Sequence, residues 1–157
     1  MKIVRATKKD CTVILELIKE LAQFEKAAEE VVATKEDLEK TLFQDNPSAF
    51  CDLAIVDGQV IGFALWFLNY STWQSKYGIY LEDLYVKTDY RGQGVGRKLL
   101  SHLARICIDN GYGRLQWWVL DWNSEAIKFY ESIGAKPMDE WTVWRVSETS
   151  LKKLADQ

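Results

Sequence analysis

The sequence predicts an α/β (α+β) fold in which helices flank a mixed β-sheet. Segments with apolar residues at helical spacing alternate along the chain with short strand-like segments, an order too interleaved for an all-β fold or a helical bundle. The chain has 157 residues, of which 48% are hydrophobic. This length suits one compact core and is too short for two ordinary domains, so we expect a single domain over residues 1–157.

The first part of the chain predicts one strand, two helices and a hairpin. Lys2–Ala6 has the pattern of a short strand. Two capping-box-like starts, at Thr7 and at Thr34, precede apolar residues at helical spacing and predict one helix each. The Asp57-Gly58 pair between two apolar runs is a strong hairpin signal, so Phe50–Phe67 should form an antiparallel pair.

The second part predicts a strand, a glycine loop, and then helices alternating with strands. Ile79–Val86 reads as a strand that leads directly into "YRGQGVG", and the apolar face that follows predicts a helix ending near Asn110 and Gly111. Beyond it we expect a strand over Leu115–Leu120, a helix over Ser124–Ile133 with Asn123 as its N-cap, and a last strand over Thr142–Val146.

Charge and composition favour a small cationic partner. The 20 Lys and Arg and 23 Asp and Glu give a net charge of −3, without a long run of one sign, which argues against nucleic acid or an anionic membrane. No apolar stretch resembles a membrane span or a signal peptide, so we expect a cytoplasmic protein. The cysteines Cys11, Cys51 and Cys107 are few and widely spaced, and His102 is the single histidine. Neither a disulfide framework nor a metal site is predicted.

The glycine loop, Tyr90–Gly96, raises the question of its ligand. A strand, then glycines, then a helix N-terminus is a geometry that binds phosphate through free amides and the helix dipole. The spacing fits neither GxxxxGK[ST] nor GxGxxG, which excludes a P-loop and a Rossmann loop. It fits R-x-x-G-x-G, a pyrophosphate loop; a plain glycine-rich turn is the alternative.

The loop and its surroundings resemble the GNAT superfamily of N-acetyltransferases. Six segments look like its diamine acetyltransferase group, which includes spermidine/spermine and thialysine N-epsilon-acetyltransferases: "LIKELAQFE", "STW", "YLEDLYV", "YRGQGVG", "VLDWN" and "FYESIGA". The thialysine branch looks more similar, because spermidine enzymes carry Asp-Pro-Trp where this chain has Ser71-Thr72-Trp73. The resemblance implies a mostly antiparallel sheet, acetyl-CoA as cosubstrate, a homodimer, and acetyl transfer by direct attack in a ternary complex.

The resemblance also implies which residues bind acetyl-CoA. The backbone amides of Leu84, Tyr85 and Val86 would hold the acetyl group and the pantetheine arm, and would stabilise the oxyanion that forms during acyl transfer. The pyrophosphate loop would consist of Arg91, Gly92, Gln93, Gly94, Val95, Gly96 and Arg97. The start of the later helix would lie beside the cofactor with Asn123, Ser124, Glu125 and Ala126.

Two residues are candidates for proton transfer. Tyr130 lies on the apolar face of its helix, which is typical of a core tyrosine, and the resemblance implies that it protonates the departing thiolate. Glu82 and Asp83 interrupt an apolar strand, where burial of a carboxylate requires a partner. Strand alternation predicts that they point to opposite faces. The resemblance makes Glu82 the ligand of the substrate ammonium and its base, acting directly or through water.

The acceptor side is implied by the resemblance at Phe24, Glu25, Trp73, Glu82 and Asp83. A solvated helix end for Glu25 and a rim aromatic for Trp73 are the plain alternatives. The predicted function is acetyl transfer from acetyl-CoA to a primary amine of a thialysine-like amino acid, diamine or polyamine. A protein N-terminal or lysine acetyltransferase and a non-catalytic coenzyme A-binding module are the competing interpretations.

Overall fold

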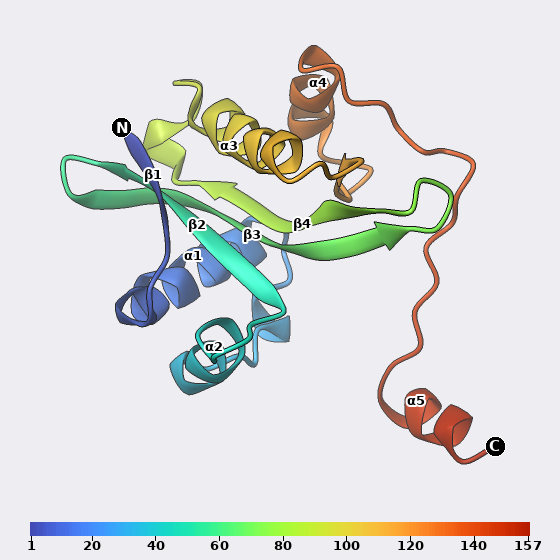
Figure 1. Ribbon diagram of the computed structural model, residues 1–157. Helices are drawn as coiled ribbons and strands as arrows, with labels where there is room; N and C mark the ends of the chain where they lie inside the picture. The colour runs from blue at the N-terminus through green and yellow to red at the C-terminus, as the bar shows by residue number, and fades with distance from the viewer. The chain divides into compact units, whose positions relative to one another are not determined.

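A computed structural model describes the whole chain, residues 1–157, as two compact units, Met1–Trp118 and Val119–Gln157. The first unit contains a five-stranded sheet and most of the helices (Figure 1). The second contains two short helices joined by irregular chain. None of the helices is long and apolar enough to cross a membrane.

The sheet has its strands in sequence order, and all but the last pair are antiparallel. β4 and β5 run parallel and meet only at the pairs Ile79–Leu115 and Tyr80–Gln116. The predicted mixed, mostly antiparallel sheet is therefore confirmed. The strands are β1 (Lys2–Arg5), β2 (Ala49–Val56), β3 (Gln59–Ser71), β4 (Lys76–Val86) and β5 (Leu115–Gln116).

Helices cover both faces of this sheet. α1 (Cys11–Phe24) and α2 (Lys35–Leu42) lie on one face and α3 (Val95–Asp109) on the other (Figure 1). Buried side chains of α1 and α2 pack with Cys51, Leu53, Phe63 and Tyr85 of the sheet to form one hydrophobic core. Three short 3₁₀ helices, η1 (Lys8–Asp10), η2 (Ala28–Glu30) and η3 (Thr88–Tyr90), complete the unit.

Local sequence signals set the element ends as predicted. Thr34 Oγ1 accepts a hydrogen bond from the Asp37 amide at 3.2 Å, and Asp37 Oδ2 accepts one from the Thr34 amide at 3.0 Å, which is a capping box. Asp57 and Gly58 both have positive φ, +50° and +82°, as a tight hairpin turn between β2 and β3 requires.

A buried carboxylate joins α3 to the sheet. Asp52 is 1% exposed, and its Oδ1 lies 3.0 Å from Arg5 Nε. Trp66 Nε1 donates to Oδ2 at 2.7 Å, and His102 Nε2 of α3 lies 3.5 Å from Oδ1. These contacts connect β1, β2, β3 and α3, the helix that begins at the glycine loop.

A β-bulge in β4 overturns the prediction that Glu82 and Asp83 point to opposite faces. Leu65 of β3 pairs with Asp83 and the next residue, Trp66, pairs with Leu81, so Glu82 is an extra residue. Asp83 shares the face of Leu65, which packs against the core on the α1 side. Glu82 lies two residues after Tyr80 on β4, so the two side chains point to the same face of the sheet. Tyr80 pairs with Phe67 of β3, which points to the same face as Leu65. Both carboxyl groups therefore project on the α1 side.

The part of the chain after α3 differs from prediction at its strands. α4 (Ser124–Ser132) forms as expected, and Asn123 Oδ1 accepts the Ala126 amide hydrogen at 3.3 Å. Residues 142–146 form no strand, although their sequence alternates like one, because a strand requires a hydrogen-bonded neighbour and the second unit contains no strand to pair with. The strand predicted over 115–120 is limited to Leu115–Gln116, and α5 (Glu148–Ala155) was not predicted.

Candidate active site

The glycine loop has the backbone conformation of an open anion site. Gly92 and Gly94 have φ of +72° and +79°, and Gly94 is the N-cap of α3. A Cβ atom on either glycine would meet no protein atom within 4 Å. Glycine is therefore favoured at these positions by the positive φ values and not by close packing against other protein atoms. The space above the loop is open. The loop and the first amides of α3 can therefore bind a phosphate group.

The end of β4 offers backbone groups that no strand pairs. One edge of β4 pairs with β3 up to the Val86–Gly62 pair. The other edge pairs with β5 only at Ile79 and Tyr80. The predicted acyl-binding residues Leu84, Tyr85 and Val86 lie beyond that point. Their free edge can hold a carbonyl oxygen or an amide of an extended ligand that lies beside the strand.

Arg91 turns back from the loop toward α1. Its Nε donates to the carbonyl oxygen of Val86 at 3.0 Å. Its guanidinium carbon lies 4.7 Å from the ring centroid of Phe24 and 5.3 Å from that of Tyr85. The structure thus brings a predicted cofactor residue into contact with Phe24, which was assigned to the acceptor side.

Three carboxyl groups gather where the bulge faces the end of α1. Burial, together with the charges of Glu82 and Glu25, raises the pKa of Asp83 to about 7. Burial also raises the pKa of Glu25. Glu82 itself is exposed. Such a cluster lacks a positive partner of its own and favours a bound cation, which would relieve the repulsion.

We expect this cluster to make stability depend on pH. The pKa of Asp83 is higher in the folded protein than its ordinary value near 3.8, so folding favours the protonated form. The stabilisation is complete below about pH 4 and is lost as pH rises through about 7. Relative to Asp83→Asn, which cannot ionise, the wild type should lose on the order of 2–4 kcal/mol of unfolding free energy between pH 4 and 8.

Urea unfolding of both proteins across that pH range measures the difference. Asp45→Asn, which changes an exposed aspartate, is the matched control and should follow the wild type. Parallel stability curves for the wild type and Asp83→Asn would contradict the burial of an ionisable Asp83.

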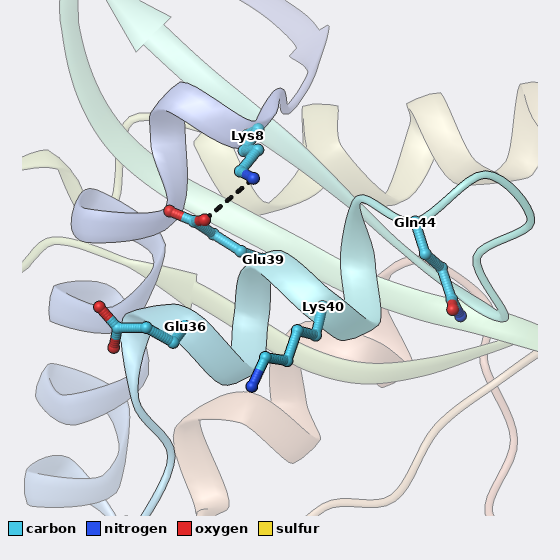
Figure 2. A pocket seen from close by; sticks show the side chains of 5 residues that line it. All are labelled: Lys8, Glu36, Glu39, Lys40 and Gln44. Carbon is cyan, nitrogen blue, oxygen red and sulfur yellow. Dashed lines mark ion pairs between the residues drawn. The ribbon is translucent and has the colours of Figure 1, made fainter.

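Two pockets differ in their relation to these residues. One, of about 250 Å³, is lined by Glu20, Gln23, Phe24, Tyr85, Thr88 and Arg91. The other, of about 440 Å³, lies at η1 and α2 and is lined by Lys8, Glu36, Glu39, Lys40 and Gln44 (Figure 2). Lys8 Nζ there is 3.1 Å from Glu39 Oε2. None of the residues that line the larger pocket was predicted to belong to the active site. Three residues of the smaller pocket were predicted as site residues: Phe24, Tyr85 and Arg91.

Trp73 is not brought to the carboxyl cluster within one chain. It lies 92% exposed in the turn between β3 and β4. Lys76, just after that turn, is six residues from Glu82 along β4, a separation of about 20 Å. Asn123–Ala126 and Tyr130 belong to the second unit, at the start and the end of α4. Their roles beside the loop stay predictions.

Sequence reasoning missed the bulge and the contacts of Arg91. Two consecutive acidic residues inside an apolar strand were a usable signal, since a regular strand would bury one of them against each face. The stack of Arg91 on Phe24 joins residues far apart in the chain, and nothing in either local sequence indicates it. Likewise the pKa of Asp83 is raised by burial and by the charges of Glu82 and Glu25, and both the burial and the approach of Glu25 arise only when distant segments pack.

Comparison with known proteins agrees with this geometry. The chain matches the acetyltransferase (GNAT) family over residues 14–135. A thialysine N-epsilon-acetyltransferase from Bos taurus is 38% identical over 93% of this chain and 92% of its own length. An L-ornithine N5-acetyltransferase from Arabidopsis thaliana is 31% identical over 95% and 85%. An integron cassette protein from the mobile metagenome of V. cholerae has a similar solved structure, with a TM-score of 0.83, 29% identity and coverage of 99% and 98%.

The open-edged strand, the glycine loop and the family match define an acyltransferase of the GNAT class, and the chain belongs to the acetyltransferase (GNAT) family. It is an N-acetyltransferase that uses acetyl-CoA as its cosubstrate. The predicted family, fold class, enzyme class and cosubstrate are thereby confirmed.

Proposed function

We propose that the acceptor is the terminal primary amine of a small cationic molecule, above all an amino acid of the thialysine or ornithine type, or a short diamine. The observation that carries this proposal is the cluster of Glu25, Glu82 and Asp83 beside the open edge of β4. Three carboxyl groups without a cationic partner among them favour an ammonium group. The two relatives, named as acetyltransferases of thialysine and of L-ornithine, agree with such an acceptor.

In the proposed ternary complex, acetyl-CoA lies along the free edge of β4 with its pyrophosphate at the glycine loop. The residues of the loop, Arg91–Arg97, present backbone amides to the phosphates. The free edge at Leu84–Val86 holds the thioester and stabilises the oxyanion that forms when the amine attacks its carbonyl carbon. The family resemblance assigns Asn123–Ala126, at the start of α4, to the same cofactor.

The proton transfers are assigned to carboxyl and phenol groups. An amine of pKa about 10 is almost fully protonated at neutral pH, and only the neutral amine attacks a thioester. Glu82 holds the ammonium and accepts its proton, directly or through water. Asp83, whose pKa is about 7, has the acidity of a base that works near neutral pH and supports the same step. When the C–S bond breaks, Tyr130 donates its proton to the departing thiolate.

A screen of amines with acetyl-CoA, followed by release of free thiol, tests the proposed function. Thialysine, ornithine, lysine and diamines should be acetylated. Turnover confined to peptide N-termini or to lysine within peptides would overturn the assignment of a small acceptor. Binding of acetyl-CoA without turnover on any amine would favour the non-catalytic module.

We predict that thialysine-like amino acids and short diamines are better acceptors than spermidine. By the resemblance, enzymes of the spermidine branch carry an aspartate where this chain has Ser71. The acceptor site of this chain therefore offers one negative charge fewer to a long polycation. A single charge contact near the surface is worth about 1 kcal/mol or less, so the preference is modest. The measurement is kcat/KM for thialysine, lysine, 1,3-diaminopropane and spermidine under one set of conditions.

Ser71→Asp should raise kcat/KM for spermidine relative to thialysine by up to about fivefold. Ser75→Asp, which adds the same charge in the same turn between β3 and β4, is the matched control and should leave the ranking unchanged. A wild type that strongly prefers spermidine, or a ranking insensitive to Ser71→Asp, would contradict this role of Ser71.

We also propose a homodimer in the cytoplasm, with acceptor sites near the subunit interface. Trp73 and Ser71 lie too far along the hairpin from Glu82 to share one acceptor site within a chain, and a partner subunit would supply them. The exposed aromatic side chains of Trp141 and Trp144 are compatible with an interface, and the buried free cysteines fit a reducing compartment. Sedimentation at working concentration should give twice the chain mass of 18.2 kDa; a monomer would contradict the proposal.

A further inference from the structure

The last turn of α1 is connected to the segment between β4 and the glycine loop by two separate contacts. Lys87 Nζ lies 3.7 Å from Glu20 Oε1. Four residues farther along each element, the guanidinium of Arg91 stacks on the ring of Phe24. The contacts join the end of α1, which Glu25 directly follows, to the residues that enter the loop.

We propose that Arg91 is a positioning residue that couples the acceptor side of the active site to the coenzyme A loop. The coupling needs no direct contact of its guanidinium with phosphate. The designation of the acceptor side rests on the proposed function, which places Glu25 beside the amine, and on the family resemblance, which assigns Phe24 to the same side.

The contacts of Arg91 favour positioning over phosphate binding. Both Phe24 and Tyr85 lie within cation–π distance of the guanidinium, and its Nε is engaged by the carbonyl oxygen of Val86. This combination fixes three elements at one point: the end of α1, the end of β4 and the start of the loop. Lysine would keep the positive charge but lacks the planar fork that stacks on a ring while donating to a carbonyl.

The arrangement predicts linkage between the two binding sites. Ordering of the loop by coenzyme A fixes Arg91 and, through the stack, Phe24 at the wall of the acceptor site. If the stack carries this coupling, a change at Phe24 alters the affinity of the loop for coenzyme A, although Phe24 lies on α1, outside the loop. A purely local role of either residue predicts no such effect.

Calorimetric titration with coenzyme A alone tests the coupling. Phe24→Leu and Arg91→Lys should each weaken coenzyme A binding by about 3- to 10-fold. The double variant should bind no more weakly than Arg91→Lys by itself, because both substitutions break the same stack. Phe43→Leu, the same substitution at a residue that packs against the core without touching Arg91, is the matched control and should retain wild-type affinity.

Wild-type coenzyme A affinity in a folded Phe24→Leu would overturn the coupling, and so would additive losses in the double variant. Kinetics with thialysine give a second test: Arg91→Lys should raise KM for thialysine about as much as KM for acetyl-CoA, whereas Arg97→Lys should raise only the latter. An unchanged KM for thialysine in Arg91→Lys would contradict the coupling, because Arg91 would then affect only the binding of acetyl-CoA. If no amine is acetylated but Phe24→Leu still weakens coenzyme A binding, the coupling stands and the proposed acceptor is wrong.

Discussion

Tyr130→Phe is expected to lower kcat by about 10²- to 10⁴-fold, the usual cost of removing a general acid. The substitution deletes one hydroxyl and little volume, so α4 and its neighbouring ring contact between Phe129 and Tyr130 should persist. Coenzyme A affinity and thermal unfolding should stay close to those of the wild type. The measurements are kcat across pH and a coenzyme A titration.

Tyr112→Phe is the matched control for this prediction. Tyr112 packs edge to face on Tyr77 in the first unit, and none of the proposed proton transfers involves it. Its loss of a hydroxyl should leave kcat unchanged. If Tyr130→Phe also retains the wild-type kcat and pH profile, water or another group protonates the thiolate.

Gly94→Val is expected to weaken coenzyme A binding about tenfold or more, which corresponds to at least about 1.4 kcal/mol. Gly94 has a φ of +79°, a conformation that a β-branched residue adopts only with strain of about 1–3 kcal/mol. The new side chain would not collide with protein, since a Cβ there meets nothing within 4 Å. Instead it would occupy the open space in which the loop amides approach the phosphates. Calorimetry with coenzyme A measures the loss.

Gly111→Val separates backbone strain from ligand exclusion. Gly111 follows the other end of α3 and has a φ of +68°, and a Cβ atom on it would likewise meet no protein atom within 4 Å. This variant should lose a similar amount of stability and keep its affinity for coenzyme A. A folded Gly94→Val variant with wild-type affinity for coenzyme A would contradict the assignment of the loop as the phosphate-binding site.

The amino-acid sequence by itself determined the features that depend on neighbouring residues. The capping box at Thr34, the Asp57-Gly58 hairpin and the order of strand, glycine loop and helix all formed as predicted. Each is specified within a few residues by hydrogen bonds or by allowed φ values, so a local pattern suffices. The motif segments around the loop were likewise enough to identify the family, which the comparison confirmed.

Only the tertiary structure decided the features that depend on pairing between distant segments. The sequence of residues 142–146 alternates like a strand but finds no partner, whereas the bulge at Glu82 exists because β3 pairs with β4 one residue out of step. That shift turns Asp83 toward Glu25, and burial beside other carboxyl groups raises its pKa to about 7. The stack of Arg91 on Phe24 arises in the same way. Strand register and charge proximity are properties of the folded chain, because residues far apart in sequence produce them only once the sheet and α1 have packed.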